Sequence, residues 1–132
     1  MKILFILPAI GKKPSEKYIG TWKMEPLTIS VLSSLTPDDI DRQFFDDRIE
    51  LIDYNTDADL VAITLETYTA KRGYDIARRF RERGIPVVVG GYHATLLPEE
   101  ALQYADSVLC GNAESVGQNA GGLPAGKPAK AL

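Results

Sequence analysis

The sequence has very few of the residues that build metal and disulfide sites. It contains one cysteine and one histidine among its 132 residues. A single cysteine excludes an internal disulfide, and one cysteine with one histidine excludes a zinc or iron–sulfur site made from such ligands within the chain. Sparse cysteine is typical of a reducing compartment, so we expect a cytoplasmic protein.

The sequence also lacks long apolar runs and a strong excess of charge. No apolar run approaches the length of a membrane span, and the run after Lys2 is too short for a signal peptide. Apolar residues make up 45% of the chain and charged residues 25%, the balance of a globular domain, with a net charge of −3. This charge gives no reason to expect nucleic acid as a partner.

Apolar segments alternate with helical ones along most of the chain. The expected strands cover residues 3–7, a short stretch around 44–45, and residues 60–65, 85–89 and 107–110; the expected helices cover about 24–35, 69–83 and a segment that begins at Pro98. Gly84 stands where a left-handed residue would end the helix before it. Strands separated by helices need crossover connections, so we expect a parallel sheet with helices on both faces.

This alternation predicts an α/β fold, namely a flavodoxin-like (Rossmann-like) three-layer sandwich with a five-stranded parallel sheet in the order 2-1-3-4-5. We expect one domain over residues 1–115. Residues 116–132 are rich in Gly, Ala, Pro and Lys, and we expect them to form a flexible tail that is a linker or is not native to the domain.

A ligand of such a sheet lies outside the carboxyl ends of the strands, where the loops 8–11, 65–69, 90–94 and 111–114 meet. A dinucleotide site would need G-x-G-x-x-G after the first strand, where this chain reads Pro8-Ala9-Ile10-Gly11. A phosphoacceptor receiver would need acidic residues at strand ends that are here Pro8 and Thr64. Flavin mononucleotide stays possible, although the loop after the first strand is rich in lysine and has one serine, Ser15.

The loop after the fourth strand is the most informative of these segments. It opens with Gly90 and Gly91 and holds the only histidine, His93. Each residue also has an ordinary interpretation, because a glycine pair is often only a tight turn and a lone histidine is often only a packing contact. Glu66 at an apolar strand end either reaches solvent in the crevice or pairs with a basic neighbour. The functional interpretation gains weight because these residues gather at one edge of one sheet.

At these residues the chain resembles the cobalamin-binding domain that precedes the radical S-adenosylmethionine (SAM) domain in B12-dependent radical enzymes, among them the anaerobic Mg-protoporphyrin monomethyl ester oxidative cyclase and related methylases. The matching stretches are residues 2–8, Pro26-Leu27, residues 59–64, residues 83–95, residues 98–102 and Gly111-Asn112-Ala113-Glu114, in the family's order. The most specific of them is the loop Gly90-Gly91-Tyr92-His93-Ala94-Thr95, followed by Leu-Pro-Glu-Glu.

The resemblance implies cobalamin bound base-off without a histidine axial ligand, because the D-x-H-x-x-G motif of methionine synthase and mutase-type domains is absent. It implies that loop 64–67 faces the lower side of the corrin, that the glycine pair approaches the nucleotide tail, and that His93 hydrogen-bonds a corrin amide or the phosphate. The cofactor contacts that it implies come from Pro8, Ala9, Thr64, Leu65, Glu66, Thr67, Gly90, Gly91, Tyr92, His93, Ala94, Gly111, Asn112 and Glu114.

The C-x-x-x-C-x-x-C motif that holds a [4Fe-4S] cluster in the family's catalytic part is absent from this sequence. We therefore expect the chain to bind cobalamin but not to catalyse, with the cluster, SAM and the methyl transfer or oxidative cyclisation belonging to a separate radical SAM domain. That domain is the expected partner, and the surface that meets it could support self-association. The alternatives are a flavodoxin-like domain for FMN or another small ligand, and a non-catalytic interaction module.

Overall fold

Five strands and their connecting helices form the part of the chain that the computed structural model describes, residues 1–10 and 25–114. In chain order the elements are β1 (Lys2–Leu7), α1 (Leu27–Leu35), β2 (Asp41–Asp46), β3 (Leu60–Thr64), the 3₁₀ turn η1 (Thr67–Thr69), α2 (Ala70–Glu82), β4 (Val87–Gly90), α3 (Tyr92–Leu96), α4 (Pro98–Ala101) and β5 (Ser107–Val108). The expected tail at 116–132 and the lysine-rich loop with Ser15 lie outside the described residues. No helix within the described ranges is long and apolar enough to cross a membrane.

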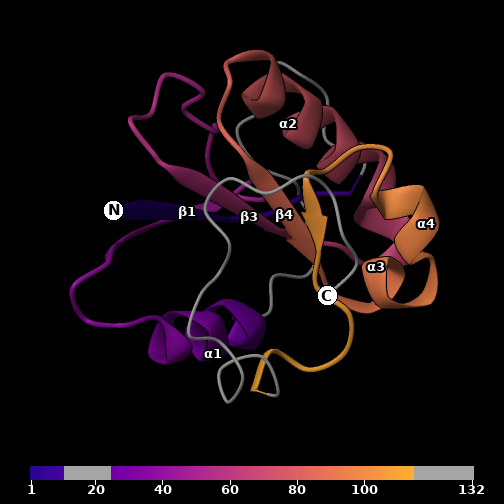
Figure 1. Cartoon of the computed structure of the whole chain (residues 1–132), viewed down its shortest axis with the longest axis horizontal. Helices are drawn as coiled ribbons and strands as arrows, with labels where there is room; N and C mark the ends of the chain where they lie inside the picture. The colour runs from indigo at the N-terminus through magenta and orange to yellow at the C-terminus, as the bar shows by residue number, and fades with distance from the viewer. Residues whose placement is uncertain (11–24, 115–132) are drawn as a thin grey trace.

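The sheet confirms the predicted fold. Its strand order is β2-β1-β3-β4-β5, and every neighbouring pair is parallel. The central strand β1 pairs with β2 on one side and with β3 on the other, for example at Phe5, which lies opposite Phe44 and Ala62. All strands therefore end at the same edge of the sheet, and the loops predicted to carry the site leave from that edge (Figure 1).

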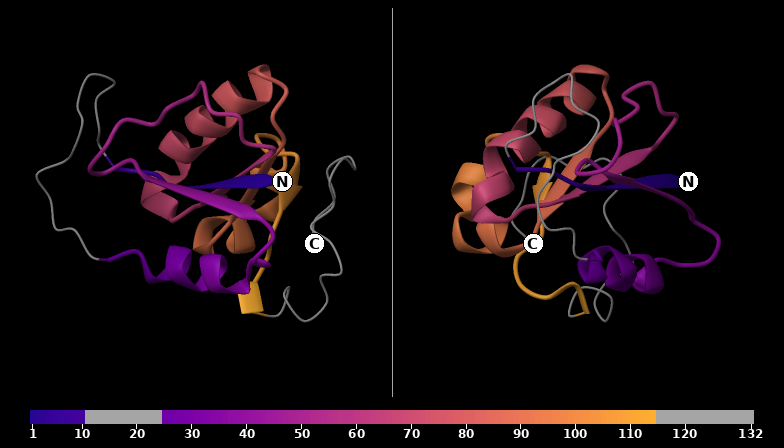
Figure 2. Two further views of the ribbon diagram at one scale, coloured as in Figure 1. Left: turned by 90° about the vertical axis from the view of Figure 1, so that its left-hand side faces the viewer. Right: turned by 180° about the vertical axis from the view of Figure 1, so that it is seen from behind.

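The two faces of the sheet are covered by different helices, as Figure 2 shows: α2, α3 and α4 lie on one side and α1 lies on the other. Alternate residues of each strand point to opposite faces, which divides the core into two clusters. The larger cluster contains Leu4, Ile6, Val61, Ile63, Val87 and Val89 of the strands together with Ile76, Ala77 and Phe80 of α2. The buried members of the smaller cluster are Ile3, Phe5 and Ile29 of α1.

Three local features differ from the expectation or extend it. The second strand is a full strand of six residues rather than a short stretch around Phe44. The fifth strand ends at Val108 rather than at Cys110, although the Leu109 N–H still donates to the Val89 carbonyl at 2.8 Å, and Gly111 has φ +82°. A helix begins directly after Gly91, where a polar loop as far as Pro98 was expected. The expected left-handed residue, Gly84, has φ +77°.

Gly91 makes the early start of α3 possible. Its φ is +95° and its ψ is −176°, a conformation that is open only to glycine. A Cβ atom at this position would lie 2.6 Å from the carbonyl oxygen and 2.9 Å from the nitrogen of Leu65, which are backbone atoms without freedom to move aside. The backbone of Gly91 therefore touches the end of β3, and no other residue type fits between them.

We predict that Gly91→Ala lowers the free energy of unfolding by at least about 3 kcal/mol, since it adds a backbone clash to an unfavourable φ. Gly84→Ala is the matched control, because Gly84 also has a positive φ but a Cβ atom added there would meet nothing within 4 Å. We expect that control to cost only about 1 kcal/mol. Urea unfolding followed by circular dichroism measures both, and equal losses would contradict the assigned close approach.

Candidate functional site

The ends of β3 and β4 are joined by hydrogen bonds that bring the two predicted loops together. The Leu65 N–H donates to the Gly90 carbonyl at 2.7 Å, and the His93 N–H donates to the Leu65 carbonyl at 3.1 Å. The loop after β5 is tied to the same place, because the Gly111 N–H donates to the Thr95 hydroxyl at 3.0 Å. Three of the four predicted loops therefore lie beside one another at the carboxyl edge of the sheet.

The predicted site residues divide into two groups by exposure. Those with surface at this edge are Glu66, Thr67, Gly90, Gly91, Tyr92, Gly111, Asn112 and Glu114. Those that the structure buries are Pro8, Ala9, Thr64, Leu65, His93 and Ala94. The buried group shapes the edge from beneath, and the exposed group provides the surface that a ligand would meet.

Asp47 and Arg72 form a buried ion pair at this edge that the sequence interpretation missed. The Asp47 side chain is fully buried, and Arg72 donates to both of its oxygens, from Nε to Oδ2 and from Nη2 to Oδ1, each at 2.9 Å. The Ala9 N–H donates to the same Oδ2 at 2.9 Å. The Asp47 N–H in turn donates to the Leu7 carbonyl at 3.0 Å. Asp47 therefore fixes the chain where it leaves β1 and joins it to the first turn of α2.

A second arginine–carboxylate pair lies next to the first. Arg48 donates from Nε to Oδ1 of Asp46 at 2.9 Å and from Nη2 to Oδ2 at 2.8 Å. In both pairs the hydrogen bonds to the carboxylate raise the pKa of the arginine, Arg48 through Asp46 and Arg72 through Asp47. The guanidinium groups at this edge are thus engaged by carboxylates, which is a poor arrangement for holding a phosphate by arginine.

Glu66 follows β3 and stands at the point where the strand order reverses. Its backbone is held by Thr69, whose hydroxyl accepts from the Glu66 N–H at 3.0 Å. Partial burial raises the pKa of the Glu66 carboxyl. It forms no ion pair with a basic side chain that the structure describes, so the interpretation in which Glu66 pairs with a basic neighbour is not supported.

His93 points into the protein and not toward the exposed edge. Its ring is buried, and Nε2 lies 2.9 Å from Oε1 of Glu100, which also accepts from the Tyr74 hydroxyl at 3.0 Å. The Tyr74 ring stacks on Tyr104, with 4.1 Å between the ring centroids. The network joins α2, α3 and α4, so the contacts seen for His93 are structural. The predicted corrin contact of His93 stays a prediction.

The same network shifts two pKa values. The hydrogen bonds from His93 and Tyr74 lower the pKa of Glu100. Burial, and then the hydrogen bond to Glu100, raise the pKa of Tyr74 well above its usual value. Tyr74 therefore stays protonated and acts only as a hydrogen-bond donor to the carboxylate.

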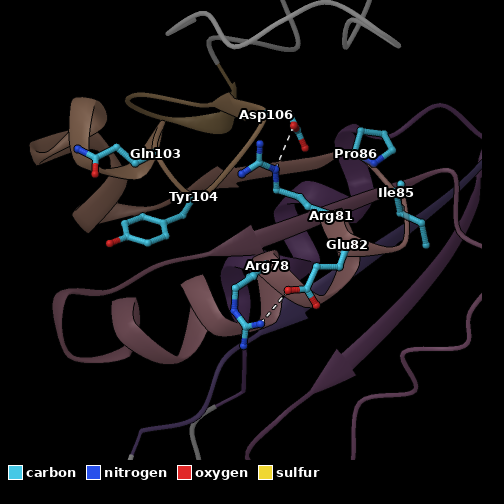
Figure 3. A pocket seen from close by; sticks show the side chains of 9 residues that line it. Arg78, Arg81, Glu82, Ile85, Pro86, Gln103, Tyr104 and Asp106 are labelled. Atoms are coloured by element: carbon cyan, nitrogen blue, oxygen red, sulfur yellow. Dashed lines mark hydrogen bonds and ion pairs between the residues drawn. The ribbon is translucent and has the colours of Figure 1, made fainter.

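A cavity of about 570 Å³ lies at the opposite edge of the sheet (Figure 3). It opens before the amino ends of β4 and β5, where Pro86 and Asp106 line it. Its charged side chains are paired with one another, Arg78 with Glu82 at 2.8 Å and Arg81 with Asp106 at 3.1 Å (Figure 3). Because ligands of this fold bind at the carboxyl edge, we do not assign the site to this cavity.

We predict that Asp47→Asn lowers the free energy of unfolding by about 3 kcal/mol, because it leaves the part-buried Arg72 without its charged partner. Glu82→Gln is the matched control, since it breaks the Arg78–Glu82 pair, whose side chains are 60% and 61% exposed. Exposed pairs of this kind contribute less than about 0.5 kcal/mol. Urea unfolding compares the two variants. A loss of unfolding free energy for Asp47→Asn as small as that of the control would show that the Asp47–Arg72 pair does not fix the chain after β1.

We predict that the stabilisation from Glu100 depends on pH. Because its pKa is lower in the folded protein than the ordinary value of 4.5, its contribution is present above pH 4.5 and is lost as the pH falls through the folded pKa. Glu100→Gln should therefore be less stable than the parent near neutral pH, and the difference should shrink in acid. Unfolding curves at several pH values measure this, and a difference that is constant with pH would refute it.

Comparison with known proteins gives two relatives. The chain is 41% identical over 91 residues to the bacteriochlorophyllide d C-8(2)-methyltransferase of Chlorobaculum tepidum, which is 68% of this chain and 20% of the relative. It is 37% identical over 93 residues to the C-12(1)-methyltransferase of the same organism, 69% of this chain and 20% of the relative. No protein-family model and no solved structure matches. The chain is therefore similar, over two thirds of its length, to a segment that makes up about one fifth of each of two bacteriochlorophyllide methyltransferases.

Proposed function

We propose that this chain is the cobalamin-binding domain of a radical SAM methyltransferase that acts on a tetrapyrrole. The observation that carries the proposal is the position of the Gly90–Thr95 loop, the most specific part of the resemblance to B12 domains, at the carboxyl edge of a flavodoxin-like sheet. The two relatives support the reaction and the substrate class, since both are named as methyltransferases of a bacteriochlorophyllide. They favour methyl transfer over oxidative cyclisation.

The residues at the edge suit the amide groups of cobalamin better than they suit a cofactor held mainly by arginine–phosphate contacts. Cobalamin presents many neutral amide groups, which need hydrogen-bond acceptors and donors more than they need positive charge. The edge offers the Glu66 carboxylate, the Thr67 hydroxyl and the accessible backbone of Gly90 and Gly91. Its two described arginines, Arg48 and Arg72, are bound to aspartates. These hydrogen-bonding groups therefore fit the amides of cobalamin.

The position of His93 supports binding without a histidine axial ligand. It is the only histidine of the chain, and its ring is buried with Nε2 against Glu100. To reach a cobalt ion it would have to leave the Tyr74–Glu100 network and expose the interior between α2 and α3. We assign His93 the role of a positioning residue that holds α3 and so holds the Gly90–Gly91 turn.

The matched segment is much shorter than the two relatives, which suggests how binding and catalysis divide between the parts of a longer enzyme. When bound, cobalamin supplies the chemistry of a methyl carrier. The residues described in this chain would bind and orient it, since they provide a surface and no described catalytic constellation. The relatives are about five times as long as the segment matched, and the proposed [4Fe-4S] cluster and SAM site would belong to that larger remainder.

We predict that the 132-residue chain retains hydroxocobalamin in a 1:1 ratio through gel filtration and does not retain FMN. The absorbance spectrum should be that of base-off cobalamin, and it should be the same in His93→Gln. Retention of FMN without cobalamin would overturn the proposal, and a spectrum of histidine-ligated cobalt that disappears in His93→Gln would overturn the axial-ligand part.

Substitutions of two exposed polar residues test where on the domain cobalamin binds. Thr67 lies at the carboxyl edge, and Gln103 lines the cavity at the opposite edge. Thr67→Arg should weaken cobalamin binding by about tenfold or more, equivalent to about 1.4 kcal/mol, while Gln103→Arg should leave it unchanged. The reverse result would move the site to the cavity.

A further inference from the structure

The carboxylate of Asp47 lies among hydrogen-bond donors that come from two separate segments of the chain. The Ala9 N–H donates to Oδ2, and the Arg72 guanidinium donates from Nε to Oδ2 and from Nη2 to Oδ1, each at 2.9 Å. A guanidinium that donates twice to one anion, together with a backbone N–H of a loop, is also the arrangement by which proteins hold phosphate. We call the Ala9 N–H and the Arg72 guanidinium the anion cradle.

The anion cradle lies where a ligand of this fold would bring a phosphate. Ala9 comes two residues after the end of β1, and Arg72 is in the first turn of α2, which follows β3. Strands β1 and β3 are neighbours in the sheet, and the strand order reverses between them. The amino end of a helix also favours an anion, because its backbone dipoles add up to a partial positive charge there. The cradle therefore has both the position and the charge of a phosphate site.

The protein fills this cradle with a side chain of its own. The Asp47 side chain has no exposed surface, and the Arg72 side chain is 23% exposed. The backbone of Asp47 is fixed as well, because its N–H donates to the Leu7 carbonyl at 3.0 Å. A carboxylate tethered in this way acts at a high effective concentration, so a free anion competes poorly with it.

The neighbouring arginine is occupied in the same way. Arg48 donates from Nε and from Nη2 to the two oxygens of Asp46, and their side chains are 16% and 7% exposed. These two residues are only two positions apart, so their pair joins no distant segments of the fold. Its effect is to engage a second guanidinium at the same edge. Consecutive aspartates thus engage both arginines that the structure describes there.

We infer that Asp47 is a specificity-determining residue, whose carboxylate occupies the anion cradle and keeps phosphate groups from binding at the carboxyl edge. The ligands that it excludes are those anchored mainly by phosphate, such as flavin mononucleotide. This inference deepens the proposed function, because it names what the same edge rejects, but it depends on no property of cobalamin. Removal of the carboxylate should turn the cradle into a phosphate site.

The test removes the carboxylate and adds inorganic phosphate. Asp47→Ala takes away the acceptor, and Asp47→Ala/Arg72→Gln takes away the guanidinium as well. Urea unfolding followed by circular dichroism, with about 10 mM phosphate or with chloride at the same ionic strength, gives the affinity for phosphate from the shift of the midpoint. Relative to the parent, we expect Asp47→Ala to bind phosphate at least about tenfold more tightly and the double variant to bind it no more tightly.

A matched control and a second measurement keep the result unambiguous. Glu82→Gln releases Arg78, whose side chain is 60% exposed, and should gain no affinity for phosphate. If Asp47→Ala is unfolded in chloride, phosphate should refold it, because a ligand that binds only the folded state shifts the equilibrium toward that state.

Three results would overturn the inference. They are a phosphate shift in Asp47→Ala no larger than in the parent or in Glu82→Gln, a gain that persists in the double variant, and an unfolded Asp47→Ala that phosphate does not refold. None of these measurements uses cobalamin, so the retention experiment decides the proposed function separately.

Discussion

The contact between the backbone of Gly91 and the end of β3 is the constraint on which the edge of this sheet depends. It requires a conformation that only glycine adopts, and it places the first turn of α3 directly on Leu65. Because α3 begins there, Tyr92 is left outside with 74% of its surface exposed, while His93 turns inward to Glu100. One close approach therefore decides which residue of the loop meets solvent and which becomes part of the interior.

A buried carboxylate, Asp47, fixes the carboxyl edge of the sheet where β1 and β2 end. Asp47 lies in the interior and satisfies hydrogen-bond donors from Ala9 and Arg72, so three segments distant in sequence meet at one carboxylate. A buried ion pair contributes little net stability by comparison with apolar packing, but its loss is costly because the remaining charge is unpaired. It therefore acts to specify geometry, holding the exit of β1 at a defined distance from α2.

The sheet could be predicted from the sequence because its signals are local. Continuous apolar runs such as residues 60–64 mark strands buried on both faces, and Gly84 marks the end of α2. The inward turn of His93 could not be predicted, since it depends on how Gly91 meets a strand that lies 26 residues earlier in the chain, at Leu65. The Asp47–Arg72 pair also needed the folded arrangement, although two acids after a strand were a signal. The helix at α1 was also predicted from its apolar spacing, but the division of its apolar residues was visible only in the structure, where Ile29 and Leu32 pack against the sheet and Leu27 and Leu35 are exposed.

The two outermost strands differ in how much of their backbone they offer to a strand of another chain. An edge strand presents unpaired backbone groups on which another strand can build. Strand β5 pairs over only two residues, so that edge offers a very short template. Strand β2 is longer, with the sequence DRQFFD, and its aromatic pair is flanked by Asp41, Arg42 and Asp46. Of these, Asp41 is exposed at the start of the strand, and an exposed charge on an edge strand disfavours pairing with a further strand.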